Sequence, residues 1–169
     1  MKILVLNCSA FRGSITEGYC YLFSSACSLE KIKTTKINLY GEKIPMCNGR
    51  KYQRPDKLSD IQKLVIAADG LFISTSVHWF NVPAVLKNFI DHISCVDVDL
   101  WQKERPLCCF VYSPEGGEIG ALSAIILPLN MMGFCLPANG YAYYNGKGDK
   151  WADDEVKAFP RRMKDCLEA

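Results

Sequence analysis

Three short apolar runs constrain the fold of this chain more than any other feature. They span residues 2–6, 70–74 and 107–112, and each is almost continuously apolar. Runs of this kind are typical of strands that are buried on both faces, as in parallel sheets. Two weaker runs, residues 34–39 and 133–136, would supply two further strands. The sequence therefore predicts five strands.

Helical patterns separate these runs. Apolar side chains recur at helical spacing in residues 58–65, 82–93, 122–129 and 156–167. A first helix is expected from about Ser14 to Leu29. We expect Pro128 to kink the end of one helix and Pro160 to interrupt the last one. The alternation of strand and helix predicts an α/β fold with a parallel sheet covered on both faces, in one domain over residues 1–169.

Composition and charge exclude several classes of protein. The net charge of the 169-residue chain is +2, and its basic residues are scattered, so we expect no nucleic-acid partner. No apolar run reaches the roughly 18 residues of a membrane span, and the first residues make a poor signal peptide, so we expect a cytoplasmic protein with no membrane partner. Nine cysteines, an odd number, are interpreted mainly as small buried apolar residues. With only two histidines, a multi-histidine metal site is not expected.

The loop after the first strand is rich in small and hydroxyl residues. It reads LNCSAFRGSIT over residues 6–16 and leads into the first predicted helix. A helix N-terminus offers free N–H groups and a positive dipole end, which favour an anion. Ser9, Ser14 and Thr16 add hydroxyl groups and Arg12 adds a positive charge. The alternative is an ordinary N-cap, for which Ser14 alone would suffice. Neither a P-loop nor a dinucleotide-binding fingerprint is present.

The loops after the third and fourth strands are also candidates for a binding site, because ligands of such sheets bind at the carboxyl ends of the strands. His78, Trp79 and Phe80 follow the third strand. Exposed aromatic residues there favour a flat ligand, although a neighbouring loop or a second subunit could also cover them. Gly116 and Gly117 follow the fourth strand, and would allow either a close approach to a ligand or a plain turn.

Together these loops resemble the flavodoxin-like NAD(P)H-dependent FMN reductases over nearly the whole chain. The first loop is similar to the family's phosphate-binding turn, and residues 68–91 are similar to its second motif. The matching residues are Ser9, Arg12, Ser14, Thr16, Ala68, Asp69, Val77, Trp79, Pro83, Lys87, Phe89, Asp91, Ser113, Gly116 and Gly117. The resemblance implies a flavodoxin-like three-layer sandwich, with a five-stranded parallel sheet in the order 2-1-3-4-5.

The resemblance also implies a site for FMN, with its phosphate on the first loop and its ring along all three. The cofactor-binding residues would be Ser9, Arg12, Ser14, Ile15, Thr16, Ser76, Val77, His78, Trp79, Phe80, Asn81, Ser113, Glu115, Gly116 and Gly117. No metal ligand is expected, and His78 is the one candidate for a catalytic acid or base. Some relatives carry a C-x-x-C motif after the second strand, whereas this chain has Cys47 alone there, so we expect no iron–sulfur cluster.

Departures from the family pattern concern the lining of the site. Cys8 stands where the family has glycine, Ser76 where it has proline, and His78 where it has tyrosine. His92 takes the place of an arginine. These substitutions bear on the substrate and, to a smaller extent, on flavin binding.

Three functions are compatible with this reading. The first is an FMN-dependent oxidoreductase that passes a hydride from NAD(P)H through bound FMN to a quinone, a flavin or another small acceptor. The second is a flavodoxin-type electron carrier, although such carriers are usually strongly acidic and this chain is slightly basic. The third is a flavin-free relative that acts as an interaction module. Relatives commonly dimerise, so the resemblance also implies a homodimer.

Overall fold

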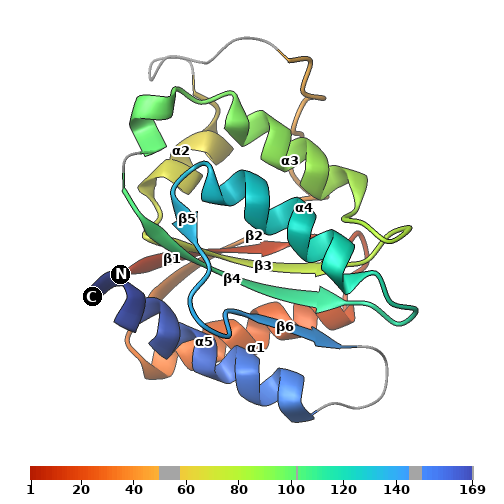
Figure 1. Ribbon diagram of the computed structural model, residues 1–169, viewed down its shortest axis with the longest axis vertical. Helices are drawn as coiled ribbons and strands as arrows, with labels where there is room; N and C mark the ends of the chain where they lie inside the picture. The colour runs from red at the N-terminus through yellow and green to blue at the C-terminus, as the bar shows by residue number, and fades with distance from the viewer. Residues whose placement is uncertain (50–57, 102, 145–149, 169) are drawn as a thin grey trace.

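A computed structural model describes residues 1–49, 58–101, 103–144 and 150–168, and the elements form three layers (Figure 1). The helices are α1 (Ile15–Leu29), α2 (Asp60–Ala67), α3 (Ala84–Ser94), α4 (Glu118–Asn130) and α5 (Lys150–Glu168), with a 3-10 turn, η2 (Val98–Trp101). The strands are β1 (Lys2–Asn7), β2 (Lys33–Asn38), β3 (Gly70–Ser76), β4 (Arg105–Tyr112), β5 (Phe134–Cys135) and β6 (Tyr141–Tyr144). Helices α1 and α5 cover one face of the sheet, and α2, α3 and α4 cover the other.

The sheet is parallel and has the predicted order, β2-β1-β3-β4-β5, with β6 also paired to β4. The fifth position differs in detail from the single strand expected at residues 133–136. It is shared by β5, which pairs with the start of β4, and β6, which pairs with Cys109 to Tyr112. Pro137 lacks the N–H that a ladder needs, and Asn139 has a φ of 54°, so the chain leaves the sheet between the two segments.

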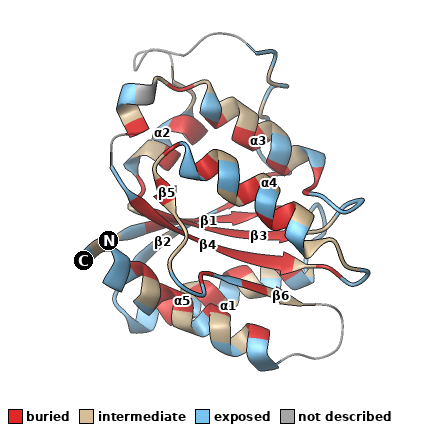
Figure 2. Cartoon of the chain, in the orientation of Figure 1, coloured by how far each residue is buried: buried red, intermediate tan, exposed pale blue. Residues whose placement is uncertain are grey.

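Burial on both faces holds the centre of the sheet together (Figure 2). Almost all of β1, β3 and β4 is buried, as the continuous apolar runs predict. On the α1–α5 face, the rings of Phe23 and Phe72 stack with their centroids 4.1 Å apart, and Phe159 packs beside them. On the other face, Leu86 and Phe89 of α3 are fully buried. Each face therefore has its own apolar layer.

The helix boundaries follow local chemistry with one exception. The Ser14 hydroxyl caps α1 by accepting a hydrogen bond from the N–H of Glu17, and Ser59 with Gln62 forms a capping box at α2. Helix α4 ends at Asn130, two residues after Pro128. The predicted interruption at Pro160 is wrong, because α5 continues through it. Proline removes one hydrogen bond from a helix, and here the apolar face of α5 packs against the sheet and maintains the helix.

The loops after β1, β3 and β4 leave the same edge of the sheet, on the right in Figure 1. Hydrogen bonds join them at their bases. The Cys8 N–H donates to the Ser74 carbonyl, and the Ser74 hydroxyl donates to the Thr16 carbonyl at 2.7 Å. None of the helices in the described ranges is long and apolar enough to cross a membrane.

Candidate functional site

A tight turn at the end of β3 presents two aromatic side chains. The backbones of His78 and Asn81 pair across it, with N–H to carbonyl distances of 2.7 and 3.1 Å. The two residues between them, Trp79 and Phe80, have φ values of 47° and 60°. Two positive φ values match a type I′ turn, in which Asn-Gly is the usual pair. Large aromatic residues there are strained, and such strain persists only where the surroundings maintain it.

Two glycines provide those surroundings. Gly117 ends the loop after β4 (residues 113–117, the third loop), and Gly120 lies in the first turn of α4. A Cβ on Gly120 would lie 2.2 Å from the Phe80 carbonyl oxygen, and one on Gly117 would lie 2.8 Å from the Phe80 Cα. The Val77 N–H donates to the Tyr112 carbonyl at 2.8 Å, which ties the base of the turn to β4. The aromatic turn therefore packs directly on the start of α4, backbone against backbone.

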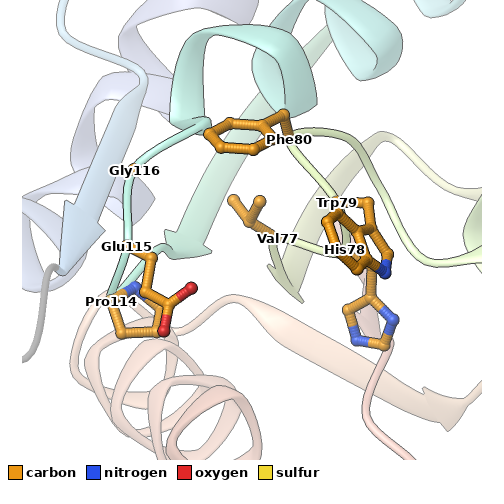
Figure 3. A pocket seen from close by; sticks show the side chains of 7 residues that line it. All are labelled: Val77, His78, Trp79, Phe80, Pro114, Glu115 and Gly116. Atoms are coloured by element: carbon orange, nitrogen blue, oxygen red, sulfur yellow. The ribbon is translucent and has the colours of Figure 1, made fainter.

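A cavity of about 350 Å³ lies between the aromatic turn and the third loop (Figure 3). Its lining consists of Val77, His78, Trp79, Phe80, Pro114, Glu115 and Gly116. Pro114 and Glu115 stand on one side, and His78 and Trp79 on the other. Trp79 is 94% exposed and Phe80 is 64% exposed. Exposed aromatic side chains next to a cavity make this the candidate binding site.

Unused hydrogen-bonding groups surround the cavity. The Ser113 hydroxyl, one residue before the lining residue Pro114, is fully buried and has no hydrogen-bond partner among the described residues. No described residue accepts a hydrogen bond from the N–H groups of Trp79 and Phe80. Buried polar atoms without partners are rare in native proteins, and each calls for an explanation. A ligand in the cavity that accepts hydrogen bonds would pair with the N–H groups of Trp79 and Phe80.

The first loop combines free donors with a positive charge. Among the described residues, no acceptor is found for the N–H groups of Ile15 and Thr16 at the start of α1, and none forms an ion pair with Arg12. The side chains of Ser14 and Thr16 are already engaged. The Thr16 hydroxyl is buried and donates to the Asn7 side chain at 3.1 Å, and the Ser14 oxygen lies 3.1 Å from it. The backbone of this loop, more than its hydroxyl groups, is therefore available to an anion.

Glu17 places a negative charge against the same loop. Its carboxylate accepts a hydrogen bond from the Gly13 N–H at 2.7 Å, and its other oxygen lies 3.9 Å from the Lys36 amine. An acidic residue in the first turn of a helix is favourable for the helix dipole. It also occupies one of the donors that an anionic ligand would otherwise use.

The structure brings some predicted site residues together and keeps others apart. Val77, His78, Trp79, Phe80, Glu115 and Gly116 line the cavity. The predicted residues outside its lining are Ser9, Arg12, Ser14, Ile15, Thr16, Ser76, Asn81, Ser113 and Gly117. Pro114, Glu17 and Gly120 were not predicted. Pro114 could have been inferred from its place between Ser113 and Glu115, whereas the other two act through contacts that depend on the folded loop.

Cys8, the departure at the family's glycine position, does not obstruct the first loop. Its side chain is buried in the core beside Leu6 and Leu39. Burial raises the pKa of the Cys8 thiol well above its usual value, so the group stays neutral and unreactive. No described group of three or more His, Cys, Asp or Glu side chains could hold a metal ion.

The sequence matches the family of NADPH-dependent FMN reductases over residues 1–165, and the chain therefore belongs to that family. This confirms the resemblance seen in the three loops. A comparison with curated protein sequences finds no match.

Solved structures confirm the flavodoxin-like fold. RosB, solved with the bound intermediate 8-demethyl-8-formylriboflavin-5′-phosphate, superposes with a TM-score of 0.82 at 16% identity over 99% of this chain and 79% of its own. A flavodoxin from the domain Archaea has a TM-score of 0.70 at 14% identity, covering 100% of both chains. An azoreductase from Bacillus anthracis has a TM-score of 0.62 at 13% identity, over 98% of this chain and 97% of its own.

Substitution of Gly120 tests the packing of the aromatic turn on α4. We expect Gly120→Ala to lower the free energy of unfolding by about 1–3 kcal/mol, because the new Cβ displaces the Phe80 backbone. Gly18 lies in α1, where an added Cβ would have no atom within 4 Å, so Gly18→Ala should raise the free energy of unfolding by about 0.5–1 kcal/mol. Urea denaturation measures both changes, and a Gly120→Ala protein as stable as Gly18→Ala would contradict the packing.

Proposed function

We propose that the protein is an FMN-dependent oxidoreductase that uses NAD(P)H to reduce a small acceptor. The observation that carries the proposal is the cavity between the strained aromatic turn and the third loop, lined in part by Trp79 and Phe80, whose N–H groups have no acceptor among the described residues. Membership of the FMN reductase family supports the same conclusion. Bound FMN would supply the redox chemistry, accepting a hydride from NAD(P)H and passing electrons to the acceptor.

The three loops would divide the binding of FMN between them. The backbone at Ile15 and Thr16, with Ser9, Ser14 and the Arg12 guanidinium, would hold the phosphate, since a helix N-terminus favours an anion. The residues that would hold the ring are Ser76, Val77, His78, Trp79, Phe80, Asn81, Ser113, Glu115, Gly116 and Gly117. The free N–H groups of Trp79 and Phe80 would donate to its polar edge, and their side chains would exclude water from it.

The open side of the cavity suits a second small molecule. His78 is exposed at its rim, and a ring nitrogen there could give a proton to a reduced acceptor. One structural neighbour is named as an azoreductase, which supports an acceptor of small-molecule size. Another is named as a flavodoxin, so an electron carrier is the alternative function. The net charge of +2 favours the enzyme, because electron carriers that dock on basic partners are usually acidic.

Two substitutions of opposite sign test the phosphate site. Arg12→Ala should weaken FMN binding about ten- to a hundredfold, because it removes a charge-assisted hydrogen bond. Glu17→Gln should strengthen FMN binding about three- to tenfold, because it removes a negative charge beside the phosphate while its amide oxygen can still accept from Gly13. Isothermal titration calorimetry measures both affinities.

Riboflavin, which lacks the phosphate, is the matched ligand. Its affinity should be the same for the native protein and both variants. Glu30→Gln, at the other end of α1, removes the same charge and should leave FMN affinity unchanged. If Arg12→Ala weakens FMN and riboflavin equally, the first loop does not bind the phosphate.

We also propose that the protein is a homodimer that associates through α4. This helix is apolar on both sides. Ala121, Leu122, Ile125 and Leu129 are buried, whereas Ile119 and Leu127 are exposed on the opposite side together with Met131 at the helix end. A helix that is apolar all round is normally buried all round. Phe80 packs on the start of α4, so a partner on this face would also cover the aromatic turn.

A charge on the outer face of α4 tests the dimer. Leu127→Glu should convert the protein to a monomer in sedimentation velocity, because an ionised carboxylate opposes burial. Leu29 on α1 is at least as exposed, and Leu29→Glu should leave the dimer intact. A native protein that sediments as a monomer at micromolar concentration would contradict the proposal.

A further inference from the structure

Two cysteines that are 48 residues apart in the sequence meet in the structure. The sulfur atoms of Cys47 and Cys95 lie 3.6 Å apart. Cys47 follows β2, and Cys95 is the C-cap residue of α3. Both are half-buried, so a small oxidant can reach them. The sequence has no second cysteine at C-x-x-C spacing from Cys47. The cysteine that lies beside it in the folded chain is Cys95, at the end of α3.

Hydrogen bonds hold the segment around Cys47 on α3. The Cys47 N–H donates to the side-chain oxygen of Asn88 at 2.8 Å, and the Asn88 amide donates to the carbonyls of Ile44 and Pro45. Both thiols donate to the Asp91 carbonyl, at 3.5 and 3.4 Å. Hydrogen bonds to Asn88 therefore hold the backbone of Cys47 against α3, and both thiols lie at the same Asp91 carbonyl.

The surroundings tolerate the loss of both thiol protons. When the two S–H groups disappear, the Asp91 carbonyl keeps a hydrogen bond from the Ser94 hydroxyl at 2.7 Å. The acceptor that the two thiols shared therefore still has a donor. A disulfide requires a sulfur–sulfur distance of about 2.05 Å, so the two sulfurs must approach by roughly 1.5 Å to form the bond.

We propose that Cys47 and Cys95 form a reversible disulfide, a redox-modification site that locks the segment after β2 onto α3. The oxidant is a hydroperoxide. One thiol attacks its oxygen and becomes a sulfenic acid, releasing water or an alcohol. The second thiol attacks the sulfenic sulfur and expels one molecule of water. Two thiols lose two protons and two electrons, and the hydroperoxide gains them, so the reaction is balanced. A dithiol reverses it by exchange.

The remaining cysteines of the described part are poorly placed for this chemistry. Cys8, Cys20, Cys27, Cys108 and Cys109 are buried, and burial raises the pKa of each of these thiols. Cys166 is exposed and would cross-link separate copies of the chain. No other pair of cysteine sulfurs among the described residues is in hydrogen-bond contact. Burial also raises the pKa of Cys95, so oxidation should need an excess of peroxide and minutes of reaction.

Peptide mapping after oxidation tests the proposal without reference to flavin. The protein carries Cys166→Ser to prevent cross-linking, and it is treated with excess hydrogen peroxide and then digested without reductant. We expect a peptide that links Cys47 to Cys95, lighter than the sum of its parts by two hydrogens. The Tm should rise by about 5–10 °C, because the bond closes a long loop, and dithiothreitol should reverse the rise.

Matched variants separate the pair from other thiols. Adding Cys95→Ser should abolish both the linked peptide and the Tm shift. The serine hydroxyl can still donate to the Asp91 carbonyl, so this variant keeps the local hydrogen bond. Adding Cys135→Ser, at a half-buried cysteine elsewhere, should preserve both. The proposal is overturned if Cys47 and Cys95 remain free thiols after other cysteines have reacted, or if they proceed to sulfinic acids without linking.

Discussion

Strands β1, β3 and β4 are buried on both faces, and this burial positions the loops of the candidate site. Their side chains leave almost no surface exposed, so the three strands must lie at the centre of a sheet between two layers of helices. Parallel pairing then directs all three carboxyl ends to one edge. Core packing therefore brings together loops that are far apart in the sequence, in addition to the hydrogen bonds at their bases.

The aromatic turn shows how that rigid edge supports an unfavourable local conformation. Trp79 and Phe80 adopt positive φ values that each disfavour the fold by about 1–3 kcal/mol. Cross-turn hydrogen bonds and the close contact with Gly117 and Gly120 offset this strain. The result is a fixed pair of exposed aromatic side chains beside a cavity. A loop optimised for stability alone would place glycine or asparagine there and would bury its apolar residues elsewhere.

The sequence predicted what depends on continuous patterns and missed what depends on single contacts. The apolar runs located β1, β3 and β4, and the stripes located the main helices. The split between β5 and β6 was missed, because Pro137 and Asn139 interrupt a run too short to be recognised in two parts. Most residues lining the cavity were predicted from the family resemblance. The hydrogen bond from the Gly13 N–H to Glu17 and the contact between the Cys47 and Cys95 sulfurs were not predicted, because neither leaves a periodic pattern in the sequence.

Anaerobic reduction of the FMN-loaded protein distinguishes an NAD(P)H-dependent enzyme from an electron carrier. NADPH and NADH are mixed separately with the complex, and the visible absorption band of oxidised flavin is followed. We expect at least one nucleotide to bleach the band within seconds, and a quinone or free flavin added afterwards to restore it. A band that stays unchanged for minutes with both nucleotides, while dithionite bleaches it, would contradict the enzyme and favour an electron carrier.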